Sequence, residues 1–214
     1  MNPTPSSDAT DNDSVIPYQG WHVLHLFYQI EQAQWSLLSD EEQLLLRELS
    51  VFAGSFPLVG VEAVATESQT PVLARLQSLV QQSLVVPVRG SGRYRLLETV
   101  RLYALDKLAD TDQIGALRGR HLAWVHESFG LSAAAQTSDR ETLAFEDQIW
   151  AEVENAIAAM EWAEETGDAD ALFGVFIGFA VVWQNDTRYA NTGLSWLERI
   201  PIPPSTDPLA RTLW

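Results

Sequence analysis

The segment Gly92-Arg93-Tyr94-Arg95-Leu96-Leu97-Glu98-Thr99-Val100-Arg101-Leu102-Tyr103-Ala104-Leu105 decides the fold of this chain. Tyr94 and Leu96 alternate with arginines, which predicts a strand with one packed face and one wet face. From Glu98 onward, apolar residues recur at helical spacing, so a helix is expected to begin there. The segment therefore passes directly from a strand into a helix.

The residues before this segment supply the other half of a β-hairpin. Residues 84–88 read as a first strand, and Pro87 confines that strand to a sheet edge. Residues 89–92, Arg-Gly-Ser-Gly, form the loop.

Helices are expected upstream of the hairpin. Residues 39–42 form a capping box that opens a helix, and a short helix is expected over about 58–66. Thr70 is expected to cap a helix over 71–82. Short helices followed by a hairpin and another helix predict a winged helix over about 38–110.

The second half of the chain predicts helices only. One long helix is expected over 111–136, and residues 138–141 form a second capping box. Further helices are expected from about Trp150 to Gly167, over about 169–184 and over about 187–199, with Gly167 and Asp168 as adjoining caps. Asp207-Pro208 begins a last helix of about seven residues, which is too short to fold alone. We expect that the chain is cut, or naturally truncated, inside a helical array.

These patterns predict a mainly α-helical fold, in which a winged helix with a small β-hairpin precedes a helical array. We expect four parts along the chain. They are a disordered tail over 1–18, a winged-helix domain over 19–110 that begins with a leading helix over 20–38, a connecting helix over 111–137 and the array over 138–214.

Composition narrows the class of protein. The 214 residues include no cysteine, so disulfides and thiolate metal sites are excluded. The longest apolar run, over 21–30, contains two histidines and a glutamine, and it is too short and too polar to span a bilayer. The tail before it is acidic, unlike the basic start of a secretory signal. We therefore expect a cytoplasmic protein without a membrane segment.

The charge of the chain is unevenly distributed. The net charge of −16 argues against unaided binding to nucleic acid. Residues 71–121 nevertheless hold eight basic and four acidic residues. The basic residues are either an ordinary solvated face or a patch for a polyanion or an acidic partner domain.

Several stretches carry a resemblance to one family. They are Trp35-Ser36-Leu37-Leu38-Ser39 with Glu41-Glu42-Gln43, Leu49-Ser50-Val51-Phe52-Ala53-Gly54 with Phe56, Leu79-Val80 with Ser83-Leu84-Val85-Val86, and Arg93 to Ala104. Together they resemble the winged-helix segment of STAND-class signalling ATPases, as in LuxR-type and AfsR-type bacterial transcriptional regulators. Residues 147–199, including Asn155, Ala158 and Trp162-Ala163, resemble the start of the tetratricopeptide-like array that follows in such proteins.

The resemblance implies a regulatory role without catalysis. The family's ATPase core would precede the winged helix and a separate basic domain would contact DNA, but this sequence contains neither a G-x-x-x-x-G-K-[ST] phosphate loop nor a basic domain. We therefore expect no enzyme activity, no cofactor, no metal site and no catalytic residue. The winged helix of this family couples a nucleotide-switch core to a helical-repeat sensor. The expected partner is accordingly a protein or a nucleotide-binding domain, in cis or in trans.

Two sets of residues are candidates for contacts with a partner. Arg89, Arg93, Arg95 and Arg101 are expected to meet an acidic or phosphate-bearing surface, and the concave side of the repeats is expected to take part in recognition. The helix over 71–82 either enters a DNA groove, with Arg75, Gln77 and Gln81 as the contacts, or serves as a packing or partner face. We do not expect this segment alone to bind DNA, and a stand-alone DNA-binding regulator is the alternative.

Three other features each have two interpretations. His121 is either a phosphate sensor or pH switch, or a partly buried polar residue. The acidic residues over 161–170 are either paired carboxylates or a solvated face. The tryptophans of the second half either fill the interfaces between helices or line a peptide-binding groove; they are Trp150, Trp162, Trp183 and Trp196.

Overall fold

The computed structural model describes residues 32–130 and 142–200. The chain divides into a short unit, Met1–Leu37, and a larger unit, Leu38–Trp214, to which the fold below belongs. Four predicted features lie wholly or mainly outside the described residues. They are the tail over 1–18, the leading helix over 20–38, the capping box over 138–141 and the helix from Asp207.

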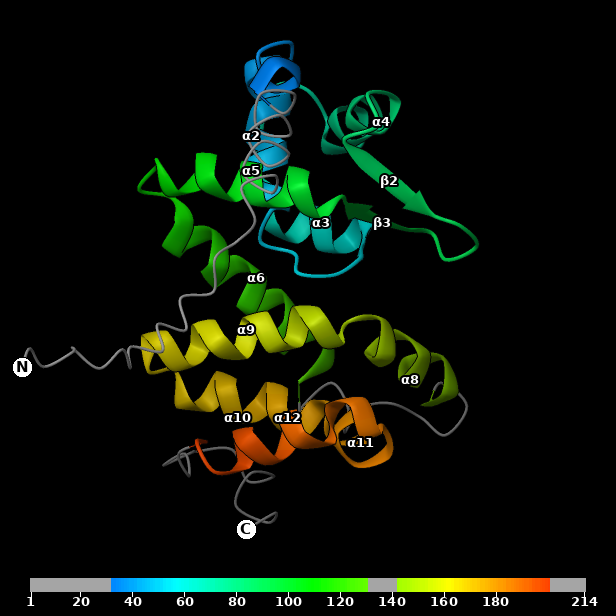
Figure 1. The fold of residues 1–214 in the computed structure, drawn as a ribbon, viewed down its shortest axis with the longest axis vertical. Coiled ribbons are helices and arrows are strands. Elements are labelled where there is room, and N and C mark those ends of the chain that lie inside the picture. Colours follow the sequence, from blue (N-terminus) through cyan, green and yellow to red (C-terminus); the bar gives the residue numbers. More distant parts are fainter. Residues whose placement is uncertain (1–31, 131–141, 201–214) are drawn as a thin grey trace, which may run out of the picture. The chain divides into compact units, whose positions relative to one another are not determined.

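The first part of the larger unit has the arrangement of a winged helix (Figure 1). Three short helices are followed by a β-hairpin and a fourth helix. In chain order they are α2 (Asp40–Leu49), α3 (Leu58–Val64), α4 (Val72–Gln81), β2 (Val85–Val88), β3 (Arg93–Leu96) and α5 (Glu98–Ala109). The predicted hairpin and the helix that begins at Glu98 are confirmed.

The ends of these helices follow local side-chain chemistry. At α2 the predicted capping box is present, since the Glu42 amide donates to the Ser39 hydroxyl over 3.3 Å and the Ser39 amide donates to the Glu42 carboxylate over 2.8 Å. The predicted cap at Thr70 is wrong, because α4 begins at Val72 and the extended Pro71 takes the cap position. The Thr70 amide instead donates to the Glu41 carboxylate over 3.3 Å.

A third strand that we did not predict completes the sheet. Strand β1 (Phe56–Pro57) pairs antiparallel with β3, so that Phe56 lies opposite Tyr94 and the strand order is β1-β3-β2. Two residues are too few for an alternating pattern, which is why sequence reasoning missed β1. Strand β2 is an edge strand, as Pro87 predicts.

Helix α6 (Ile114–Phe129) links the winged helix to the array and packs against α3, α9 and α10. The predicted bounds of 111–136 are wrong at both ends. The Thr111 hydroxyl donates to the Leu108 carbonyl over 2.7 Å, which forms a turn after α5, and Gly130 follows the last residue of α6.

The array consists of paired helices (Figure 1). Helix α9 packs on α10, and α11 packs on α12. In chain order the helices are α8 (Thr142–Ala151), α9 (Val153–Thr166), α10 (Ala169–Gly178), α11 (Ala180–Asn185) and α12 (Thr187–Leu197). The predicted caps are confirmed, because Gly167 has a φ of 74° and the Asp168 carboxylate accepts from the Ala171 amide over 3.0 Å.

Two helices predicted as continuous are broken. The helix expected to run from about 150 to Gly167 is interrupted at Glu152, whose carboxylate pairs with Arg93. The helix over 169–184 is interrupted at Phe179, whose fully buried ring lies 6.1 Å from the ring of Phe129 and 6.3 Å from that of Trp183. In both places a contact with another element coincides with the break, and such contacts leave no mark in a helical periodicity.

Aromatic rings run continuously from the winged helix into the array. Phe52 stacks on Phe56 at 4.6 Å and meets Trp124 of α6 edge-on at 5.6 Å. Trp124 meets Phe129 at 5.8 Å, and Phe129 meets Phe179 of the array at 6.1 Å. These contacts join the two parts through one apolar core. Of the four tryptophans singled out from the sequence, Trp183 and Trp196 are buried, and Trp150 and Trp162 are partly exposed.

Candidate functional site at the wing and its junction with the array

The hairpin, or wing, presents two of the four candidate arginines to solvent. Arg89 is exposed in the loop, where Gly90 and Gly92 have φ values of 76° and 67°. Because side chains rarely tolerate this left-handed conformation, the two glycines allow the sharp turn. Arg95 is exposed on β3. Both cations are therefore accessible to a partner.

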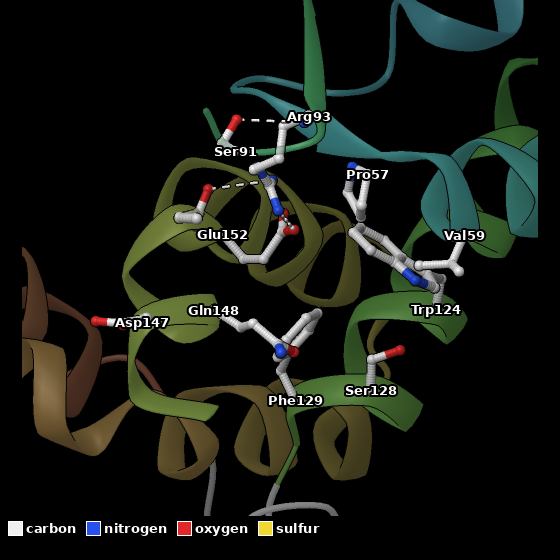
Figure 2. A pocket seen from close by; sticks show the side chains of 11 residues that line it. Pro57, Val59, Ser91, Arg93, Trp124, Ser128, Phe129, Asp147, Gln148 and Glu152 are labelled. Carbon is white, nitrogen blue, oxygen red and sulfur yellow. Dashed lines mark hydrogen bonds and ion pairs between the residues drawn. The ribbon is translucent and has the colours of Figure 1, made fainter. Parts of the chain in front are cut away.

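Arg93 points the other way, toward the array (Figure 2). Its guanidinium lies 2.6 Å from the carboxylate of Glu152, which has no exposed side-chain surface. The same guanidinium donates to the Ser55 hydroxyl over 2.8 Å and to the Ser55 carbonyl over 2.6 Å. The carboxylate that Arg93 contacts thus belongs to the chain itself.

Asn155 extends this polar contact between the winged helix and α9. Its amide nitrogen donates to the Ser55 carbonyl over 2.8 Å and to the Glu152 carboxylate over 2.5 Å. Its amide oxygen accepts from the Gly54 amide over 3.2 Å. We call Ser55, Arg93, Glu152 and Asn155 the junction cluster. It ties the wing and the segment before β1 to the start of α9.

Burial and neighbouring polar groups have opposite effects on the pKa of Glu152 in the junction cluster. Removal from water raises the pKa of Glu152, while the adjacent Arg93 guanidinium and the Asn155 amide act in the opposite direction. A buried carboxylate paired with an arginine in this way is costly to leave unpaired. Separation of the winged helix from the array would therefore break this ion pair and expose both charges to water.

Arg101 is engaged at the start of α5. It donates to the Glu98 carboxylate over 3.0 Å and 2.8 Å and to the Ser50 carbonyl over 3.4 Å. The bidentate pair with Arg101 lowers the pKa of Glu98. Arg101 lines the same hollow as Arg95 of the wing, but it already has an acidic partner in Glu98.

Helix α4, the helix that a winged helix would place against DNA, shows a neutral outer face. Its single arginine, Arg75, is 3% exposed and donates to the Thr66 carbonyl over 3.1 Å. Gln77 and Gln81 are exposed, beside Leu73 and Ala74. Two of the three residues considered for DNA contact therefore face solvent, and the one that carries charge faces inward.

Two glutamates of α2 hold the loop between α3 and α4. The Glu41 carboxylate accepts from the Ser68 hydroxyl and from the amides of Gln69 and Thr70, and these hydrogen bonds lower its pKa to about 2. Glu48 accepts from the Thr66 amide over 2.8 Å and lies 3.6 Å from Arg120. Burial raises the pKa of Glu48.

A cavity of about 650 Å³ opens beside the junction cluster (Figure 2). The winged helix and α6 provide Pro57, Val59 and the rings of Trp124 and Phe129, and the array provides Gln148 and Glu152. In Figure 2 the Gln148 side chain points toward the cavity, whereas Asp147 points away from it. The remaining residues of the wall are Ser91, Arg93, Ser128 and Ala151.

His121 lies in the aromatic core, more deeply than the sequence indicates. It is 3% exposed, and its ring contacts those of Phe52 at 5.1 Å and Trp124 at 5.9 Å. Burial lowers its pKa to about 4, so the imidazole is neutral near pH 7. Over the described ranges, 32–130 and 142–200, no three metal-binding side chains come together. Within the same ranges no helix is long and apolar enough to cross a bilayer.

Sequence reasoning missed Ser55 and Glu152. Glu152 lies between two helical stretches and Ser55 lies in a loop, and polar residues at such positions are usually solvated. Only the folded structure brings these two side chains to Arg93. Asn155 was noted as part of a repeat-like pattern, but its contact with the winged helix was not foreseen.

Comparison with known proteins supports the fold of the first part. Residues 38–109 match the family described as winged helix-turn-helix domain. The matched segment is the one that holds α2 to α5 and the hairpin. Residues 38–109 form a winged helix-turn-helix domain.

Longer relatives match a larger part of the chain. A protein of Mycobacterium bovis and one of Mycobacterium tuberculosis, each named "Putative HTH-type transcriptional regulator", are 36% identical over 174 residues. These matches cover 78% of this chain and 19% of each relative. A further Mycobacterium tuberculosis protein, named as uncharacterized, is 42% identical over 96 residues, which are 41% of this chain and 24% of that protein. The chain thus spans about a fifth of the length of the regulators it matches. No solved structure matches it significantly.

Proposed function

We propose that this chain is a non-enzymatic regulatory module of a transcriptional regulator, in which the winged helix contacts protein rather than DNA. The observation that carries the proposal is the orientation of charge in the winged helix. Arg75 of α4 is buried and Arg93 of the wing is paired with Glu152 of the array. Two of the cations that could serve DNA phosphates, one on α4 and one on the wing, are thus used inside the molecule.

The neutral face of α4 supports this proposal further. Lysine and arginine supply the positive charge on which affinity for phosphates depends, whereas the exposed residues of α4 offer only amide and apolar groups. The net charge of −16 adds long-range repulsion from a polyanion. Arg89 and Arg95 remain as two exposed cations, which suit an acidic or phosphate-bearing protein surface.

The finer form of the proposal places the module in a STAND-class regulator of the LuxR or AfsR type. There the winged helix would couple a nucleotide-switch core to a tetratricopeptide-like sensor. Its support is the sequence resemblance, the winged-helix match and the helix pairs α9–α10 and α11–α12. In this form the junction cluster is the contact that a signal strengthens or breaks, which biases two docking states. The expected location of the module is the cytoplasm.

The test is a fluorescence anisotropy titration of labelled duplex DNA of mixed sequence with the chain at about 50 mM salt, where phosphate contacts are strongest. We expect no binding in the micromolar range. As a matched gain-of-function control, Gln77→Arg with Gln81→Arg places two cations on the exposed face of α4. Binding by the double variant would show that the assay detects this face.

The alternative function is that of a stand-alone DNA-binding regulator. It is favoured by the winged helix-turn-helix match and by the exposed wing arginines. Salt-dependent binding of DNA by the unmodified chain, reduced by Arg89→Ala and Arg95→Ala, would establish this alternative and refute our proposal.

A further inference from the structure

The cavity beside the junction cluster has the properties of a ligand site. Its volume of about 650 Å³ falls within the roughly 300–1,000 Å³ typical of small-molecule pockets. Such pockets favour domain boundaries, and this one lies where the winged helix meets the array. Pro57 and Val59 come from one side, and Gln148 and Glu152 come from the other.

The wall of the cavity indicates the chemistry of its ligand. Trp124 and Phe129 are 7% and 6% exposed, and the exposed parts of their rings form an apolar section of the wall against which an apolar body can pack (Figure 2). Arg93 and Glu152 form an ion pair in the same wall, so their charges cancel and the wall does not favour a charged ligand. The amide of Gln148 both donates and accepts, which suits a carboxamide or a phenol.

We propose that this cavity binds an uncharged aromatic small molecule with a hydrogen-bonding end, and that the bound molecule holds the winged helix against the array. The second half of this statement rests on the proposed function, because it makes the molecule an effector of docking. A ligand that contacts both sides of the junction binds the docked arrangement better than the separated one and shifts the population toward it.

The test uses 2-naphthamide as the probe, titrated calorimetrically into the full chain. We expect a Kd below about 1 mM and a rise in melting temperature at saturating probe. The charged isostere 2-naphthoate should bind at least about tenfold more weakly, because the wall offers it no free cation.

Two variants locate the site. Val59 is 62% exposed, so Val59→Trp is expected to fold, and its side chain should obstruct the cavity and weaken binding at least about tenfold. Gln148→Ala should weaken binding about fivefold through loss of its hydrogen bond. Leu194→Trp, at a site on α12 that is 60% exposed, and Gln77→Ala on α4 are the matched controls and should bind like the wild type.

Three results would overturn the inference. They are the absence of binding to the wild type, unchanged binding in Val59→Trp, and binding of the naphthoate as tight as that of the amide. The DNA titration separates this inference from the proposed function. If the chain binds DNA and also binds the naphthamide in the cavity, the proposed function is refuted but the ligand site stands. If the chain binds neither DNA nor the naphthamide, the proposed function stands but the ligand site is refuted.

Discussion

At the scale of single residues, Arg93 and Glu152 join the winged helix to the array. The guanidinium is held by a carboxylate without exposed side-chain surface and by both oxygens of Ser55. A pair of this kind stabilises only the arrangement in which both partners are present, because either one alone would be a buried, uncompensated charge. The pair therefore favours the docked arrangement that the structure shows.

A double-mutant cycle measures this coupling. Glu152→Leu and Arg93→Met should each reduce the free energy of unfolding by about 3 kcal/mol, because each leaves the other charge buried and unpaired. The double variant should lose less than the sum of the two, by at least about 1 kcal/mol, in urea denaturation. Arg188→Met, at a pair with Asp186 in which Arg188 is 75% exposed, should change stability by less than about 0.5 kcal/mol. Strictly additive losses would contradict a coupled pair.

Glu41 makes a second prediction at this scale, on acid stability. Its pKa is about 2 in the folded chain and 4.5 as the ordinary value, so the folded state favours the ionised form. Its contribution to stability is complete above about pH 5 and is lost as the pH falls from 4.5 toward 2. In thermal melts between pH 5 and pH 2.5, Glu41→Gln should flatten the acid-induced fall in melting temperature. Glu62→Gln, on the exposed face of α3, is the control and should keep the slope of the wild type. An unchanged slope in Glu41→Gln would show that its hydrogen bonds are not formed.

At the scale of elements, α6 is the shared support of both parts. It packs on α3 of the winged helix and on α9 and α10 of the array. Its end approaches α10 so closely that a Cβ added at Gly178 would lie 1.9 Å from the Phe129 carbonyl oxygen. A backbone oxygen cannot move aside as a flexible side chain can, so glycine is required there.

Two glycine substitutions test this packing. Gly178→Ala should destabilise the chain by about 1–3 kcal/mol or more, because α10 must shift away from α6. Gly119→Ala, within α6 where an added Cβ meets nothing within 4 Å, should be neutral or stabilising by up to about 1 kcal/mol. Thermal denaturation followed by circular dichroism compares the two. Equal effects would argue against the close contact between α6 and α10.

Elements also show what the sequence could and could not predict. The caps at Ser39, Gly167 and Asp168 were predicted correctly because each depends on bonds within a few residues. The breaks at Glu152 and Phe179 were missed because each coincides with a contact made by a distant element. For the same reason the sequence pattern showed which positions of the wing and of α4 carry arginines, but not that Arg93 and Arg75 turn inward.

At the scale of the whole molecule, the continuous aromatic core and the junction cluster make the winged helix and the array one folded unit. The rings from Phe52 to Phe179 supply apolar contact, and Arg93 and Asn155 supply largely buried polar contact. Under the proposed regulatory function, a signal would act by changing how firmly these two parts are docked. The cavity between them is suited to such control.

Differential scanning calorimetry tests most directly whether the winged helix and the array unfold as one unit. We predict a single unfolding transition whose calorimetric enthalpy equals its van't Hoff enthalpy, because the shared core unfolds cooperatively. Two separate transitions in the unmodified chain, one for the winged helix and one for the array, would contradict the account.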